Sequence, residues 1–356
     1  MKKFALGSIG ALLASVLIET TLGPFAPWVS LLIFLVPLAL ANVVLARRQE
    51  PGRDNPSVAT PPSRARRSFN PWVYVFAAAL FLWFYVDHLN ERKWGRAFDE
   101  GTAAFTSRNY ANAETRLKVA VSIAQKLNNP TNLCKSQNYL GNTYLNEGKH
   151  EDSRNTFEAA IRSCAHSRNA SDLIAAYASL GAAYEQLGGN NEGAETALKK
   201  ALELAHQNLQ ADDPQLASVL NNLGAVKQSQ GRYSEAEVFF RQAVSIWQHT
   251  SGADLGSGYS NLGHVLFLEG KLAEAEGLYR QSLEIAEKDY GPNSPETAPV
   301  LNNLAVLYQR EKKFNQAKEL LQRAISNAEN AQVPNMSRIE TLKKNYTDLL
   351  EEARKQ

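Results

Sequence analysis

Apolar and polar positions follow a helical period through most of the chain. Leu140 and Tyr144 share one side of a first predicted helix, and Ser153 and Phe157 share one side of a second. Gly148 stands between the two stretches, where the chain needs a turn. The pattern therefore predicts two short helices that fold back on each other as a hairpin.

The same pattern occurs six times, with a period of 39 to 43 residues. Each copy is marked by a small residue in its first helix, and these residues are Gly101, Gly141, Gly181, Gly224, Gly263 and Ala305. A second small residue follows twelve or thirteen positions later, at Ala113, Ser153, Ala194, Ala236, Ala275 and Ala317. A large apolar residue comes four positions after that, at Leu117, Phe157, Leu198, Phe240, Tyr279 and Leu321. Because one hairpin cannot bury its apolar faces alone, we expect the copies to stack into an all-α solenoid.

Three apolar runs precede these repeats, at residues 4–18, 25–46 and 72–86. A helix that spans a bilayer needs about 20 apolar residues. The second run reaches this length alone, and the other two reach it only with flanking polar residues. We therefore predict a two-helix transmembrane hairpin at 1–46 and a third transmembrane helix at 71–90. Two alternatives stay open, because the first run is also typical of a cleaved signal peptide and the third of a buried core helix.

The segment 47–70 combines six arginines with four prolines and only two acidic residues. This composition predicts a disordered loop, and short Arg-rich loops stay in the cytoplasm. Lys2 and Lys3 favour the same side for the N-terminus, so the repeats are expected on the extracytoplasmic face. Arg92 and Lys93, just after the third run, oppose this orientation. No aromatic residue is interleaved with the arginines before Phe69, so a membrane surface explains the loop better than nucleic acid does.

The two cysteines of the chain, Cys134 and Cys164, fall at matching ends of one predicted hairpin. Cys134 lies near the start of the first helix and Cys164 near the end of the second. These two ends meet in an antiparallel pair, so we expect a disulfide, which requires an environment outside the cytosol. The alternative is two buried thiols that face the core.

Candidate chemistry is sparse. The six histidines are scattered and lack the spacing of metal ligands, and the many carboxylates fall on the solvent faces of predicted helices. The overall net charge of +2 selects neither a strongly acidic nor a strongly basic partner. The sequence therefore favours a protein that is not an enzyme, with no metal, no cofactor and no small-molecule substrate.

The repeats resemble the tetratricopeptide repeat, and in particular the subtype found in kinesin light chains. The resemblance rests on the period, on Leu-Asn-Asn-Leu-Gly at 220–224, and on Leu-Asn-Asn-Leu-Ala at 301–305. It also rests on Asp-Tyr-Gly-Pro-Asn-Ser-Pro-Glu-Thr-Ala at 289–298. The pattern departs at Glu100, where the other copies have Leu, and at Lys227, where an aromatic or aliphatic residue is expected.

The resemblance implies a binding module rather than a motor, because such repeats also occur widely in bacterial proteins. It implies a repeat domain at 91–332, a superhelical solenoid of about six hairpins. The amphipathic segment at 333–356 is expected to be a helix that caps the open end of the stack. With the apolar runs, this predicts an integral protein of a bacterial inner membrane, whose repeats lie outside the cytoplasm.

In the family, the first helix of each repeat lines a concave groove, through positions three before and one, four and five after the small residue. The partner-binding residues implied here include Lys135, Asn138, Asn142, Asn146, Asn221, Gln228, Ser260, His264, Asn302, Gln309 and Arg310. Amide groups both donate and accept hydrogen bonds, so they can pair with the backbone of an extended peptide. The alternative is that they form ordinary polar surface.

The sequence thus predicts a membrane-anchored scaffold that binds a protein or peptide partner in a groove. Two further hypotheses stay open. One is an adaptor that faces the cytoplasm, and the other is a non-catalytic subunit of an envelope complex that uses the edges of its repeats.

Overall fold

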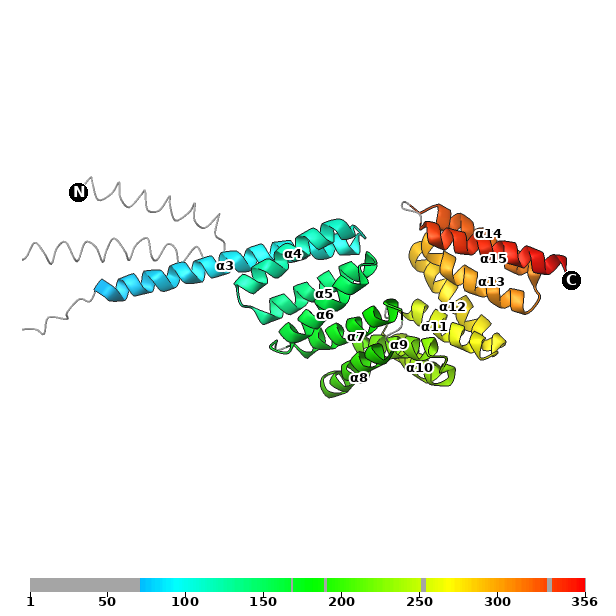
Figure 1. Cartoon of the computed structure of the whole chain (residues 1–356), viewed down its shortest axis with the longest axis horizontal. Coiled ribbons are helices and arrows are strands. Elements are labelled where there is room, and N and C mark those ends of the chain that lie inside the picture. Colours follow the sequence, from blue (N-terminus) through cyan, green and yellow to red (C-terminus); the bar gives the residue numbers. More distant parts are fainter. Residues whose placement is uncertain (1–70, 168, 189–190, 251–253, 332–334, 356) are drawn as a thin grey trace, which may run out of the picture. The chain divides into compact units, whose positions relative to one another are not determined.

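The structure is a computed structural model, and it describes residues 71–167, 169–188, 191–250, 254–331 and 335–355. Within these residues the chain forms thirteen α-helices and one 3-10 helix. The helices are α3 (Pro71–Thr106), α4 (Tyr110–Lys126), α5 (Pro130–Asn146), α6 (His150–Cys164), α7 (Ala170–Gln186), α8 (Asn191–Asn208), α9 (Pro214–Ser229), α10 (Tyr233–Thr250), α11 (Leu255–Leu268), α12 (Leu272–Tyr290), η2 (Pro295–Thr297), α13 (Ala298–Arg310), α14 (Phe314–Glu329) and α15 (Met336–Arg354). The described residues are therefore all-α, as the sequence predicts (Figure 1).

The chain divides into two units, which meet between Asp87 and His88. In the second unit, consecutive helices pair as hairpins: α5 with α6, α7 with α8, α9 with α10, α11 with α12, and α13 with α14. The end of α3 packs on α4 in the same way, because the Cα of Gly101 faces Leu117. The capping helix α15 packs on α14. These pairs reproduce the predicted six hairpins and the cap.

The small residue of each first helix is required where the two helices of a hairpin cross. A Cβ atom on Gly141 would lie 2.6 Å from the ring of Phe157, and one on Gly224 would lie 2.7 Å from the ring of Phe240. Both rings are fully buried. A larger side chain at either glycine would therefore push the helix axes apart. The regular spacing of small and large residues in the sequence thus results from a packing contact that recurs in each repeat.

Turns and caps fix where each helix begins. The side chains of Asn129 and Asp213 accept hydrogen bonds from backbone N–H groups in the first turns of α5 and α9, at 3.1 Å and 2.8 Å. A proline follows each of them. Gly148 adopts φ of 74° at the turn between α5 and α6, a conformation that suits glycine. Residues close together in sequence therefore fix where these helices begin and where the hairpin turns.

Among the described residues, no helix is both long and apolar enough to cross a membrane. The third transmembrane helix expected at 71–90 stays a prediction from the sequence. The apolar stretch of α3 ends at Val86, and the charged residues Asp87, Glu91 and Arg92 follow closely. The alternative of a buried core helix does not fit the described residues, since Phe76 is 68% exposed. The hairpin expected at 1–46 and the loop expected at 47–70 lie outside the described residues.

Candidate functional site

The first helices of the repeats form one continuous wall. The helix α5 contacts α7, α7 contacts α9, α9 contacts α11, and α11 contacts α13. The second helices of neighbouring repeats make no comparable contact with each other among the described residues. In a curved stack, the helices on the inner side are the ones that lie closest together. We therefore take these first helices as the lining of the concave side, which we call the groove.

Two hydrogen bonds join neighbouring first helices in the C-terminal half of the groove, and a third joins the first helix α13 to the capping helix α15; we call these three bonds the polar rungs. They run from Asn261 Nδ2 to Asn221 Oδ1 at 3.0 Å, from Asn303 Nδ2 to Ser260 Oγ at 3.2 Å, and from Asn345 Nδ2 to Asn302 Oδ1 at 2.8 Å. Asn221, Ser260 and Asn302 were expected to face a partner. The structure instead uses their side chains to hold one repeat against the next.

A second line of contacts runs beside the polar rungs. Gln228 Nε2 and His264 Nδ1 lie 3.1 Å apart, and Gln309 Nε2 donates to Glu352 Oε2 at 2.7 Å. Burial lowers the pKa of His264, which favours the neutral imidazole. Arg310 donates to the carbonyl oxygen of Phe267 at 3.2 Å, and its guanidinium lies 5.0 Å from the centre of that ring. The side chains of these four expected site residues therefore also interact with other residues of the chain itself.

The N-terminal half of the groove is organised differently. Asn142 Nδ2 donates to the carbonyl oxygen of Asn138 at 3.0 Å, and Asn146 Nδ2 donates to that of Asn142 at 2.8 Å. Both bonds lie within α5. Asn146 is exposed, and its Oδ1 accepts a hydrogen bond from the hydroxyl of Tyr110 on α4 at 3.3 Å. Asn142 and Asn146 are therefore better placed to meet a partner than the residues of the polar rungs are.

Asn138 connects the groove to the disulfide. It is only 8% exposed, and its Nδ2 donates to the carbonyl oxygen of Asp172 at 2.9 Å. Burial raises the pKa of Asp172, and the charge of the nearby Lys135 lowers it. Asn138 therefore ties α5 to α7, while Lys135, also an expected site residue, is half-buried beside this junction.

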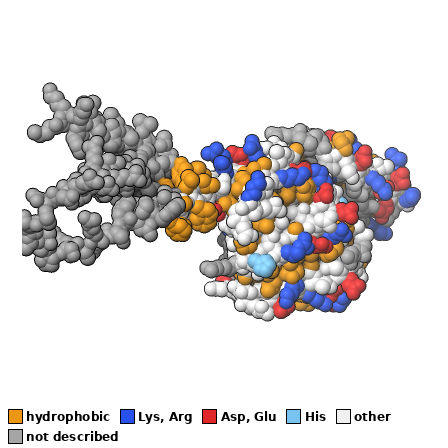
Figure 2. All heavy atoms as spheres, turned by 60° about the vertical axis from the view of Figure 1, so that its left-hand side comes forward, with side chains coloured by type: hydrophobic (Ala, Val, Ile, Leu, Met, Phe, Trp, Pro, Cys, Tyr) orange, Lys and Arg blue, Asp and Glu red, His pale blue; other side chains and the backbone are white. Residues whose placement is uncertain are grey.

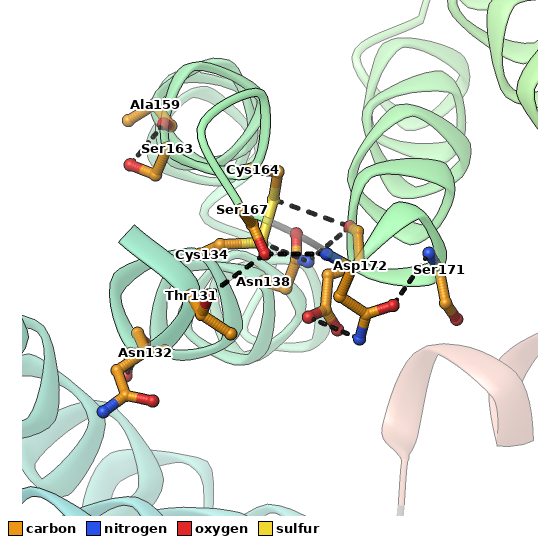
Figure 3. Close-up of a disulfide and its surroundings, with 12 residues drawn as sticks. Thr131, Asn132, Cys134, Asn138, Ala159, Ser163, Cys164, Ser167, Ser171 and Asp172 are labelled. Carbon is orange, nitrogen blue, oxygen red and sulfur yellow. Dashed lines mark hydrogen bonds between the residues drawn. A yellow bond between two sulfur atoms is a disulfide. The ribbon is translucent and has the colours of Figure 1, made fainter. Parts of the chain in front are cut away.

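Cys134 and Cys164 form a disulfide in the structure, with Cα atoms 5.0 Å apart. Figure 3 shows this bond between α5 and α6, with Asn138 and Asp172 beside it. The two cysteines are 0% and 2% exposed. The bond therefore clamps the open end of one hairpin from within the core, at the point where the next repeat begins.

Glu185 occupies a groove position implied by the family resemblance, although it is absent from the partner-binding residues named above. It lies on α7 four positions after Gly181, the register that Gln228 and Gln309 occupy in α9 and α13. It is half-buried, and burial raises the pKa of its carboxyl group. The signal in the sequence was an isolated acid in an Ala-rich helix, at a register known to line the groove.

Charged side chains do not gather by sign on the visible face of the molecule. Figure 2 shows Lys and Arg interspersed with Asp and Glu over the repeats. Many of them are paired, for example Glu237 with Lys271 at 2.8 Å. This face therefore offers no broad field of one sign to a partner. Within the described residues, no group of three His, Cys, Asp or Glu side chains is placed to hold a metal ion.

Two family models, both described as tetratricopeptide repeat, match the chain. One matches residues 172–249 and 254–330, and the other matches 135–166. No curated protein matches the sequence.

Many solved structures are similar to this chain. One is the hetero-tetramer Cut9-Hcn1 of APC/C, with a TM-score of 0.55 and 18% identity, covering 70% of this chain and 42% of that chain. Another is a Rap protein complexed with Competence and Sporulation Factor, with a TM-score of 0.53 and 18% identity, covering 74% and 76%. A third is BtubC (BKLC) from P. vanneervenii, with a TM-score of 0.49 and 20% identity, covering 69% and 94%. At these identities the likeness concerns the fold alone. The matched repeats and the stacked hairpins together identify the chain as a tetratricopeptide repeat protein.

Proposed function

We propose that the repeats dock a protein or peptide partner in the groove, and that they do so without catalysis. The observation that carries this proposal is the continuous wall of first helices, fixed by hydrogen bonds between repeats. A wall held in this way loses little freedom when a partner binds, which favours affinity. The Rap protein of similar fold was solved with Competence and Sporulation Factor bound, which is consistent with such a role for the fold.

The residues that we expect to touch the partner are only some of those at the groove positions implied by the family resemblance. Side chains of the polar rungs are occupied, so replacing them would disturb stacking and binding together. Asn142 and Asn146 keep their place as expected contacts. Gln186 and Ser229 join them, because both are exposed at the register five positions after the small residue. The kinesin light chain subtype stays a prediction from the sequence strings.

Blocking the groove is expected to abolish docking without unfolding the protein. In a Gln186→Arg, Ser229→Arg double variant, two bulky cations would stand at exposed positions on α7 and α9. We expect capture of the native partner from the source cells to fall by about tenfold or more, which corresponds to about 1.4 kcal/mol. Stability should change by less than about 0.5 kcal/mol, since exposed substitutions seldom do more. Quantitative mass spectrometry of the tagged full-length chain measures the captured partner.

The matched control is Val119→Arg, Val238→Arg. These valines are 46% and 54% exposed on the second helices α4 and α10. This variant should capture the partner as the wild type does. If it loses the partner while the groove variant keeps it, the repeats act through their outer face, as in the alternative of a structural subunit in an envelope complex.

We also propose that the three apolar runs, at 4–18, 25–46 and 72–86, attach the repeats to a bilayer, because three crossings from a cytoplasmic N-terminus leave the repeats outside the cytoplasm. The support is the sequence: the run at 25–46 alone has the length of a membrane span, and 47–70 is rich in arginine. The disulfide supports an extracytoplasmic position for the repeats, because such bonds are rare in the cytosol. The full chain should sediment with membranes after an alkaline wash, and an alkaline phosphatase fused to its C-terminus should be active. Release by the wash would exclude attachment, and an inactive fusion would favour the adaptor that faces the cytoplasm.

A further inference from the structure

A single carboxylate in the groove lacks a partner. Within the described residues of 88–356, every half-buried Asp or Glu except Glu185 has a hydrogen bond or an ion pair with another group. Glu185 has neither. Partial burial of a carboxylate without a cation or hydrogen-bond donors costs free energy. The unpaired carboxylate of Glu185 therefore needs an explanation, either in the packing of the groove or in a ligand that binds it.

The geometry of the groove explains why Glu185 is unpaired. In the neighbouring repeat, Gln228 at this register reaches His264, which lies one position after the small residue of the next first helix. The equivalent position opposite Glu185 is Ala225 on α9. Alanine can neither donate a hydrogen bond nor supply a charge. The contact that closes the wall between α9 and α11 is therefore missing between α7 and α9.

The groove positions around Glu185 carry short side chains. On α7 itself, the register positions three before and one after Gly181 are Ala178 and Ala182. With Ala225 opposite, three alanines occupy groove registers around this carboxylate. Short side chains let the backbone of a docked segment come close to the helices. This stretch of the groove therefore combines room for a chain with one uncompensated negative charge.

Among the described residues, no charged side chain on the helices that pack against α7 forms an ion pair with Glu185. These helices are α5, α6, α8 and α9. Glu158 on α6 lies near Arg154 and Tyr184, and Glu195 on α8 holds Lys227 of α9 at 2.7 Å. On α5, the charge of Lys135 acts on Asp172, at the opposite end of α7 from Glu185. The described residues thus supply no cation to this carboxylate.

We propose that Glu185 is the specificity residue of the groove and binds a Lys or Arg side chain of the docked segment. This inference rests on the function proposed above. A guanidinium or ammonium group that enters between α7 and α9 would form a charge-assisted hydrogen bond with the carboxylate. Such a bond repays the cost of burial only when a basic side chain is present, so the groove discriminates against segments that lack one.

Selection from a library of random twelve-residue peptides tests the assignment, using the full-length chain in detergent. Peptides bound by the wild type should carry Lys or Arg at one common position. Replacing that residue by Met in a selected peptide should weaken its affinity by about tenfold. In Glu185→Gln, which keeps the shape of the side chain, the same replacement should change affinity by less than about twofold. The control Glu284→Gln, at an exposed position of α12, should behave as the wild type.

The outcomes separate the two proposals. If peptides are selected and the Gln186→Arg, Ser229→Arg variant blocks them, the groove is the docking site. In that case, a missing preference for basic residues, or a preference that survives in Glu185→Gln, overturns the role of Glu185 alone. If no peptide is selected, or if the groove variant binds them unchanged, the proposed function itself fails and the inference falls with it.

Discussion

Replacing Glu195 with alanine is expected to destabilise the repeats by about 3–5 kcal/mol, because a buried lysine loses its partner. Lys227 is 3% exposed, and its Nζ lies 2.7 Å from Glu195 Oε1. Glu195 comes from α8 and Lys227 from α9, so the pair joins two repeats. Chemical denaturation of the full-length chain, followed by circular dichroism, measures the loss.

The double variant Glu195→Ala, Lys227→Leu is the matched control. Other repeats place apolar or aromatic residues at this register, such as Tyr184 and Leu266. Leucine should therefore fill the site without needing a countercharge, and stability should return to within about 1.5 kcal/mol of the wild type. If Glu195→Ala alone costs less than about 1 kcal/mol, Lys227 does not depend on this carboxylate and the inter-repeat contact is unimportant.

Acid should reveal the same contact. Hydrogen bonds from Lys199 and Lys227 lower the pKa of Glu195 from 4.5 to about 2. A carboxyl group whose pKa is lowered by folding stabilises the native state above its unfolded pKa. That contribution is lost as the pH falls from about 4.5 to about 2. The Glu195→Ala variant should therefore lose less stability than the wild type across this interval.

Removing the disulfide is expected to have the second largest effect. The bond joins residues 30 apart in sequence, and closing a loop of this length contributes about 3–4 kcal/mol by the loop-entropy model. We expect a Cys134→Ala, Cys164→Ala variant to lose this amount, since alanine leaves no buried hydroxyl behind. The midpoint of denaturant unfolding without reductant measures the difference.

Reductant provides the control for the disulfide. Wild type unfolded in dithiothreitol should match the variant, and the variant should not respond to dithiothreitol. Equal midpoints for wild type and variant without reductant would show that the cysteines do not stabilise the protein through a bond. That result would also withdraw the support that the disulfide gives to an extracytoplasmic position.

The repeated hairpin was predictable because its determinants lie close together in sequence. Gly141 meets Phe157 within one hairpin, and the same spacing recurs in every repeat. The pairing of Cys134 with Cys164 follows from the same antiparallel geometry. The third membrane helix predicted at 71–90 has no such local packing contact behind it and stays a prediction. An apolar composition at 72–86 indicates either burial or lipid, and the run reaches the length of a span only with flanking polar residues.

The sequence predicts which positions line the groove, but it does not predict which side chains contact each other there. Asn221 bonds to Asn261 and Gln228 meets His264, partners that stand 40 and 36 residues away on the next repeat. Only the stacking of repeats brings such side chains together. The sequence of a single repeat therefore shows the amide but not the residue to which it is hydrogen-bonded. For the same reason Lys227 looks anomalous in the sequence, and its role becomes clear only beside Glu195 of the preceding repeat.

Photo-crosslinking in the source cells tests the central claim, a docking groove on the concave side, most directly. A benzophenone amino acid would replace either Gln186, exposed on the first helix α7, or Val238, exposed on the second helix α10. We predict that a partner is crosslinked from position 186 and not from position 238. Crosslinking from 238 with none from 186 would contradict the account, because the partner would then lie on the outer face of the repeats.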